Sequence, residues 1–248
     1  MPLYTGYGYG TNGYGYGMSS ANLLYIAVIV LMFVGMWAQG HVSRVFQAYS
    51  GIRAKDGRAA GEVAMELLRR EGNNNVSLAR ISGTLTDNYD PRTETLNLSD
   101  AVYASNSVSA LAVAAHEAGH AMQKYTGYAP LVLRSAAVPV CNWGSRMSMP
   151  IFIAGLIFSF RPLVYVGIVL FAFAVVFSLI TLPVEFDASR RGLQMLTSGG
   201  YLSMEDEIGA RKVLRAAALT YVISALSAVV QLLRLIAIAN SGNNRRRR

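Results

Sequence analysis

Two histidines four positions apart are the feature of this chain with the clearest chemistry. Residues 114–120 read Ala-Ala-His-Glu-Ala-Gly-His, which is the pattern His-Glu-x-x-His in an alanine-rich, helix-forming context. His116 and His120 would project from one face of a helix, so that both imidazoles can reach one zinc ion. Glu117 would then act as the general base on a zinc-activated water. The pattern therefore predicts hydrolysis of peptide bonds.

Histidine is scarce in this chain, which gives the pattern weight. Of the 3 histidines, two lie in the motif, and a chance match is expected in about 1% of chains of this size. Unpartnered histidines on an alanine-rich, buried helix would be costly, so metal ligands are favoured over histidines of an ordinary core. The third histidine, His41, follows a long apolar run and is better explained as a residue at the membrane surface.

A catalytic zinc site needs a third protein ligand and one open position. With no further histidine suited to the role, a carboxylate is expected, and Glu185 and Asp187 are the first acidic residues after Glu117. They directly follow the longest apolar run, where an acid is costly unless it has a partner. We choose Glu185, because Asp187 would point about 200° away on a helix and pair with Arg190 or Arg191. The alternative for Glu185 is a solvated acid at a helix start.

The composition predicts an integral membrane protein. The chain has 248 residues, of which 53% are hydrophobic and 15% charged, and the apolar residues gather into long runs. The net charge of +8 does not indicate a nucleic-acid partner, because acidic and basic residues are interspersed in the polar sections and residues 245–248 are four arginines. A single cysteine, Cys141, requires no oxidising compartment.

Three to four transmembrane helices are expected. Residues 21–40 form the first, and the basic residues that follow it place the N-terminus outside and the next section in the cytoplasm. Residues 136–184 form a transmembrane hairpin, which returns the chain to the side where Glu185 can meet the histidines. Residues 213–239 either span the membrane or lie in its interface, because a span would put the terminal arginines outside.

Polar sections and two tails complete the division of the chain. Residues 41–134 are expected to form the catalytic domain, with a helix over 57–70, a strand-like run over 76–86, a turn at 90–93 before a second strand, and the zinc-binding helix over 105–123. Residues 185–212 would supply the third-ligand helix and a loop. A flexible tail rich in tyrosine and glycine covers 1–20, and a basic tail covers 240–248.

Four segments together resemble a known family. Residues 87–93 (Asp-Asn-Tyr-Asp-Pro-Arg-Thr), 96–99, 112–123 and 182–191 resemble the YugP-type membrane neutral zinc metallopeptidases of bacteria, over about residues 20 to 238. The resemblance implies a mainly α-helical protein of the bacterial inner membrane with a small gluzincin-like α+β catalytic domain. In that family and the similar HtpX and CAAX prenyl proteases, the two motif histidines and a downstream glutamate bind zinc.

The resemblance also carries two finer expectations. The strand before the catalytic helix, here Leu96, Asn97 and Leu98, would bind substrate at the edge of a short sheet, although a purely structural strand is the alternative. The relatives usually have Glu-x-x-x-Asp, whereas the fourth position after Glu185 is Ser189 here. The aspartate that supports a ligand histidine would therefore be absent, weaker or replaced by Asp187.

These observations lead us to expect an integral membrane zinc endopeptidase that acts on polypeptides at the cytoplasmic membrane surface. A non-catalytic scaffold or regulator, in which zinc only staples two helices, is the alternative, but structural zinc usually has four protein ligands. A transporter is a third class, since Arg146 and Gln231 lie in apolar segments, but few spans and no repeat are visible. The sequence leaves the substrate open, and also whether the protein associates with itself or with accessory membrane proteins. Gly119 permits close packing against another helix, which could belong to a partner or to the same chain.

Overall fold

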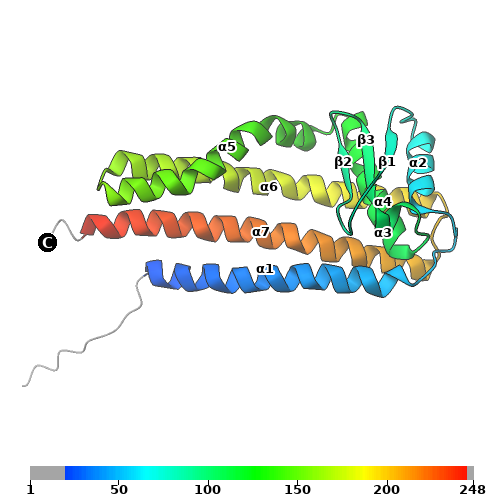
Figure 1. Ribbon diagram of the computed structural model, residues 1–248, viewed down its shortest axis with the longest axis horizontal. Helices are drawn as coiled ribbons and strands as arrows, with labels where there is room; N and C mark the ends of the chain where they lie inside the picture. Colours follow the sequence, from blue (N-terminus) through cyan, green and yellow to red (C-terminus); the bar gives the residue numbers. More distant parts are fainter. Residues whose placement is uncertain (1–19, 245–248) are drawn as a thin grey trace, which may run out of the picture.

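The computed structural model describes residues 20–244 as a helical bundle with a small domain at one end (Figure 1). The four long helices of the bundle are α1 (Ser20–Ser50), α5 (Ala129–Ile157), α6 (Arg161–Ser198) and α7 (Met204–Asn244). The domain contains a small sheet and the helices α2 (Ala60–Arg70), α3 (Asp100–Tyr103) and α4 (Val108–Tyr125). The tail expected over 1–20 lies outside the described residues except for Ser20, and so do the terminal arginines at 245–248.

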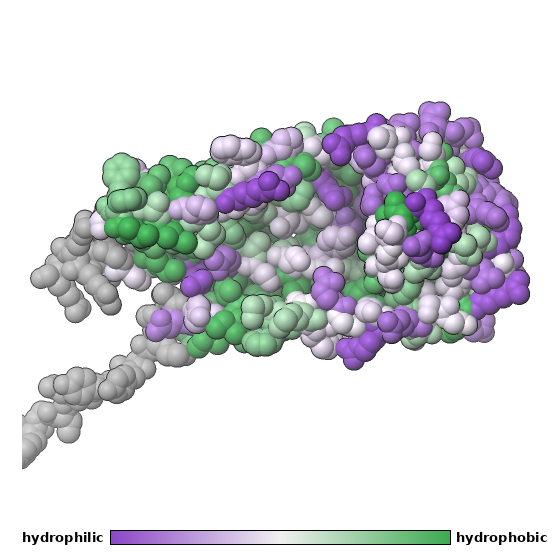
Figure 2. All heavy atoms as spheres, in the orientation of Figure 1, coloured by the Kyte–Doolittle hydropathy of each residue, from purple (hydrophilic) through white to green (hydrophobic). Residues whose placement is uncertain are grey.

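Three of the described helices are long and apolar enough to cross a membrane, namely Asn22–Ser50, Arg161–Ser198 and Met204–Ser241. Hydrophobic residues cover much of the bundle, whereas hydrophilic residues gather on the domain (Figure 2). Large apolar side chains remain exposed on the bundle, including Phe33, Trp37, Trp143, Ile157 and Phe158. Such a surface is stable in lipid rather than in water, which confirms the prediction of a membrane protein. Residues 213–239, for which a span and an interfacial helix were both expected, lie within the candidate span Met204–Ser241.

Helices α5 and α6 form a hairpin that covers the section expected to cross the membrane twice, residues 136–184. Helix α5 starts at the domain and leads to the far end of the bundle, where α6 begins after a short turn (Figure 1). It is not among the three apolar candidates, and it contains the charged residues Arg134 and Arg146. Pro139 and Pro150 lie inside α5, and Figure 1 shows a bend in this helix, as expected where proline removes a helical hydrogen bond. A membrane crossing by α5 stays a prediction.

Helix α6 does not stop where the apolar run ends. It continues for 38 residues, so the span and the third-ligand helix expected from residue 185 onward are one helix. At 1.5 Å per residue it is about 57 Å long, well beyond the roughly 30 Å of a hydrocarbon core. Glu185 is therefore carried into the domain on a continuation of the membrane helix.

The sheet has three strands in the order β1-β3-β2, with β1 at Ser77–Ile81, β2 at Asn88–Asp90 and β3 at Thr95–Ser99. Strand β3 pairs with β1 in parallel and with β2 in an antiparallel hairpin, which confirms the turn expected at 90–93. The edge position expected for Leu96, Asn97 and Leu98 is wrong, because β3 is the central strand. Both leucines are fully buried, and the backbone of β3 is paired on both sides. Among the described strands, β1 and β2 are the outer ones.

Helices α4 and α6 touch backbone to backbone at two glycines. A Cβ atom on Gly119 would lie 2.3 Å from the carbonyl oxygen of Ala188, and one on Gly192 would lie 2.3 Å from that of Ala115. No larger residue fits at either place without moving a helix. The helix against which Gly119 packs is thus one of its own chain.

Candidate metal centre

The structure brings the three predicted metal ligands together. Helix α4 presents His116 and His120 one turn apart, and α6 presents Glu185 opposite them. Oε2 of Glu185 lies 3.3 Å from Nε2 of His116 and 3.6 Å from Nε2 of His120. Ligands at 2.0–2.2 Å from a tetrahedral zinc ion are separated by about 3.4 Å. The three side chains therefore have the types and spacing that fit one zinc ion.

One oxygen of Glu185 supports this fit. Its Oε2 atom is buried and has no hydrogen-bond partner, although two imidazoles lie close to it. A buried carboxylate oxygen without a donor is costly, and a cation held between the carboxylate and the two imidazole nitrogens would remove the cost. The other oxygen, Oε1, accepts a hydrogen bond from Nη1 of Arg134 at 3.3 Å.

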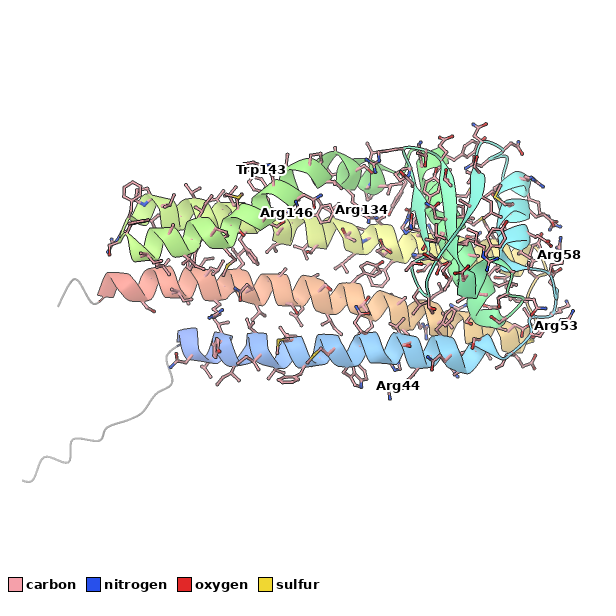
Figure 3. The ribbon with its side chains drawn as sticks, viewed as in Figure 1. Arg44, Arg53, Arg58, Arg134, Trp143 and Arg146 are labelled. Atoms are coloured by element: carbon pink, nitrogen blue, oxygen red, sulfur yellow. The ribbon has the colours of Figure 1, made fainter. Side chains whose placement is uncertain are left out.

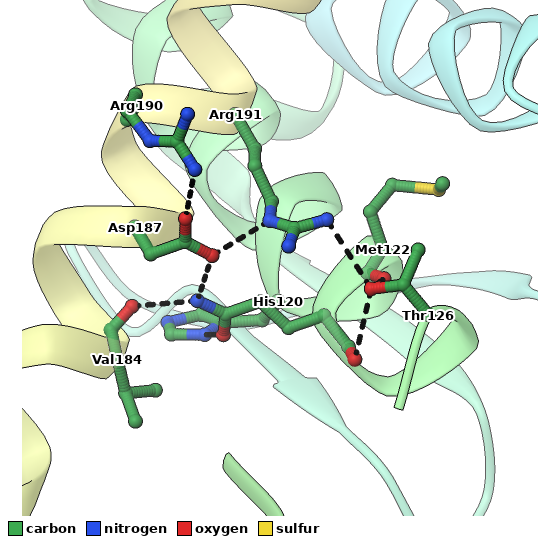
Figure 4. Close-up of polar contacts among 8 residues, drawn as sticks. His120, Met122, Thr126, Val184, Asp187, Arg190 and Arg191 are labelled. Atoms are coloured by element: carbon green, nitrogen blue, oxygen red, sulfur yellow. Dashed lines mark hydrogen bonds and ion pairs between the residues drawn. The ribbon is translucent and has the colours of Figure 1, made fainter. Parts of the chain in front are cut away.

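Gln123 fixes the orientation and tautomer of His120. The amide nitrogen of this fully buried residue donates to the carbonyl oxygen of Val184 at 2.7 Å and to Oδ2 of Asp187 at 3.0 Å. Its amide oxygen is therefore left to accept from Nδ1–H of His120, also at 3.0 Å. Figure 4 shows this network around His120 and Asp187. The assignment leaves Nε2 of His120 unprotonated and directed at Glu185, which is the tautomer that binds a metal.

The surroundings of His120 act on its pKa in opposite directions. Burial lowers the pKa, but the contact with Glu185 and the negative charges of Glu117 and Glu185 outweigh burial and raise it. The site is thus electrostatically favourable to a cation, whether that cation is a proton or a metal ion.

Ser189 supports the other histidine. Its Oγ atom lies 3.0 Å from Nδ1 of His116. A hydroxyl therefore contacts this histidine from the sequence position at which the resemblance leads us to expect an aspartate. Asp187 contacts neither histidine directly and reaches His120 only through Gln123. It also forms ion pairs with Arg190 and Arg191, the latter at 2.6 Å, as the sequence predicted.

A cavity of about 740 Å³ opens beside these residues. Glu117 lines it together with the two histidines, so the predicted base faces the same space. The cavity is also lined by β2 and the turn after it, residues 87–92, and by none of Leu96, Asn97 and Leu98. Asn97 instead donates to Oδ1 of Asn88 at 3.0 Å. The strand that adjoins the cavity is therefore β2.

Sequence reasoning missed four residues of the site. Gln123 and Ser189 were not assigned their contacts with the histidines, and Arg134 and Tyr221 line the cavity from α5 and α7. Tyr221 is a polar group within an apolar run, a signal that could have found it. His41, as expected, lies elsewhere, stacked on Trp37 of α1.

Two polar residues that raised the transporter alternative also lie outside the cavity lining. Gln231 accepts a hydrogen bond from Arg234 of the same helix at 3.4 Å, and Arg146 lies on α5 (Figure 3). The structure places neither of them beside the three candidate metal ligands.

Comparison with known proteins identifies the family. Residues 24–240 match the model of a family described as "putative neutral zinc metallopeptidase". The chain belongs to this family. It is also 41% identical over 222 residues to the "putative membrane protease YugP" of Bacillus subtilis (strain 168), an alignment that covers 90% of this chain and 99% of the relative. No solved structure matches the chain. The family membership confirms the resemblance seen in the sequence.

Proposed function

We propose that this protein is an integral membrane zinc endopeptidase in which His116, His120 and Glu185 hold the metal and Glu117 is the catalytic base. The observation that carries the proposal is the buried, unpartnered Oε2 atom of Glu185 between two imidazole nitrogens, beside a cavity that Glu117 lines. Bound zinc would supply a Lewis acid that polarises the scissile carbonyl and lowers the pKa of water.

The remaining groups of the cavity have roles that follow from their chemistry. The carboxylate of Glu117 takes a proton from the attacking water and passes it to the leaving amine. Arg134 and Tyr221 are hydrogen-bond donors on the other walls, and they can stabilise negative charge that develops on the carbonyl oxygen. Gln123 and Ser189 hold the imidazoles in place.

The substrate is proposed to be an extended polypeptide that adds to the free edge of β2. Among the described strands β2 has one neighbour, β3, and its residues line the cavity next to the metal ligands. An extended chain on this edge would be bound through its main-chain groups, with little sequence preference. This supports unfolded or membrane-tethered polypeptides as the substrate class.

The active site is proposed to face the cytoplasm of a bacterial cell. Arg44, Arg53, Lys55 and Arg58 follow the apolar run of α1 in the sequence. Figure 3 shows Arg44, Arg53 and Arg58 toward the domain end of the molecule. Helix α5 runs from the domain to the start of α6, so a membrane that α6 crosses is crossed by α5 as well. The N-terminus of α1 would then lie outside.

Cleavage of fluorescently labelled casein by the purified, zinc-loaded protein in detergent tests the proposal. The variant Glu117→Gln should bind as much zinc as the wild type and cleave at least about 100-fold more slowly. Glu62→Gln, which changes an exposed glutamate on α2, is the matched control and should cleave normally. Undiminished cleavage by Glu117→Gln would exclude this mechanism.

A non-catalytic scaffold is the second candidate function. Only three of the described histidine, cysteine and acidic side chains form the possible metal site, whereas structural zinc usually has four protein ligands. If the wild type binds one zinc ion and cleaves neither casein nor an unfolded membrane polypeptide, the scaffold is favoured.

A further inference from the structure

A second hollow, which we call the α6–α7 groove, lies between α6 and α7. Its volume is about 600 Å³, and it takes side chains from residues 186–197 of α6 and 211–222 of α7. Three arginines line it, Arg190, Arg211 and Arg215, together with apolar side chains such as Leu219 and Val222. The groove therefore combines positive charge with an apolar wall.

The charges of the groove are not balanced. Arg190 pairs with Asp187, and Arg211 pairs with Glu207 at 2.7 Å. Arg215 is exposed and has no carboxylate partner among the described residues. Two carboxylates thus pair with the three guanidinium groups, and neither carboxylate lines the groove. An anionic ligand would complete the charge pairing.

The position of the groove along the bundle indicates which kind of anion it can bind. The uncharged run of α6 ends at Val184, and the apolar run of α7 begins at Ala216. The groove thus lies at the domain end of both apolar runs, at the depth of lipid headgroups if these helices cross the membrane. Its apolar residues Ala218, Leu219 and Val222 extend from the arginines toward the membrane interior.

We propose that the α6–α7 groove binds an anionic glycerophospholipid, with the phosphate at Arg211 and Arg215 and an acyl chain along Leu219 and Val222. Arginine forms paired hydrogen bonds with phosphate oxygens, and basic pockets between membrane helices suit anionic headgroups. A free acidic peptide would match the charge, but it would leave the apolar wall uncovered; Phe186 on this wall is 48% exposed. A lipid covers both parts.

Ser189 connects the groove with the proposed metal centre. It lines the groove, and its hydroxyl lies 3.0 Å from Nδ1 of His116. Lipid binding itself requires no metal, so it should persist in chelator-treated protein. The lipid site and the proposed enzymatic function can therefore fail independently of each other.

Native mass spectrometry of the detergent-solubilised protein, offered equal amounts of dioleoyl phosphatidylglycerol and dioleoyl phosphatidylcholine, tests the proposal. The wild type should retain the anionic lipid preferentially. Each of Arg211→Gln and Arg215→Gln should weaken this retention about fivefold, and the double variant about 25-fold. Arg44→Gln on α1 is the matched control, because Arg44 is exposed and does not line the groove, and it should retain the lipid normally.

Three results would overturn the lipid site. These are equal retention of the two lipids by the wild type, unchanged retention by Arg215→Gln, or displacement of the anionic lipid by a polyglutamate peptide. Arg215→Gln is informative even if the double variant is unstable, because Arg215 has no described ion pair that its loss would break.

Discussion

Gly119 of α4 lies directly against the backbone of Ala188 in α6, so close that a Cβ atom on the glycine would be 2.3 Å from the alanine carbonyl oxygen. Gly192 makes the reciprocal contact with Ala115. Gly119 adjoins His120 in the sequence, and Ala188 is one helical turn after Glu185. The contact between the two backbones therefore sets the separation of the proposed metal ligands.

Replacing Gly192 by alanine should weaken zinc binding without touching a ligand. The added methyl group would meet backbone atoms of Ala115 and His116, which cannot rotate away, and it would push the helices apart. Overpacking of this kind costs about 1–3 kcal/mol, or roughly 2–10 °C in the thermal midpoint. We expect at least a tenfold loss of zinc affinity in competition with a chelator. Gly40→Ala, which has open space around it, is the control; wild-type affinity in Gly192→Ala would contradict this explanation.

Gln123→Met should lower zinc affinity by about 10- to 100-fold, as is typical when the hydrogen-bond partner of a ligand histidine is lost. Methionine keeps the length of the side chain but removes the acceptor for Nδ1–H of His120. Ser189→Ala should have the smaller effect, because a hydroxyl can donate or accept and does not impose one tautomer on His116. Chelator titration of both variants measures the difference, and equal or reversed effects would show that Gln123 does not select the tautomer.

A photo-crosslinking amino acid at Asn88 should capture an unfolded polypeptide several-fold more strongly than one at Ser77. Asn88 lies on β2 beside the cavity, whereas Ser77 lies on β1 at the opposite edge of the sheet. The experiment is made in the Glu117→Gln background so that bound substrate is not cleaved. Stronger capture at Ser77 would place the substrate on β1.

Glu66 should make stability depend on pH in the acidic range. Ion pairs with Arg58 and Arg70 lower the pKa of Glu66 from its usual value to about 2. Because the folded-state pKa is depressed, this stabilisation is present above pH about 4.5 and is lost as the pH falls toward 2. Glu66→Gln should lower the thermal midpoint by about 1 °C at pH 7 and by less at pH 3. Glu62→Gln, which changes an exposed glutamate on the same helix, is the matched control. A midpoint difference for Glu66→Gln that is constant with pH would be inconsistent with the ion pairs.

The proposed ligand set could be derived from sequence because zinc chemistry limits the candidates. Zinc requires a third donor, and Glu185 is an acid placed where an unpartnered acid is costly. The supporting residues Gln123 and Ser189 could not be assigned in the same way. Their contacts depend on how α4 crosses α6, which is set by glycine contacts between residues about 70 positions apart.

Two features of the fold were not predicted correctly from the sequence, namely the central position of β3 and the length of α6. The alternation of leucines in β3 predicted a strand, but alternation does not say which strands lie beside it, so the central position of β3 was missed. Hydropathy marked the end of the apolar run at Val184, but it did not mark the end of α6, because a helix can continue from lipid into a polar domain.

Zinc content per chain, measured after dialysis for the wild type, Glu185→Ala and Glu205→Ala, tests the central claim most directly. Glu205 is an exposed glutamate at the start of α7 and serves as the control. We expect about one zinc ion per chain in the wild type and in Glu205→Ala, and a loss of affinity of more than about 100-fold in Glu185→Ala. If Glu185→Ala binds one zinc ion per chain with wild-type affinity, the metal is not held where α4 meets α6.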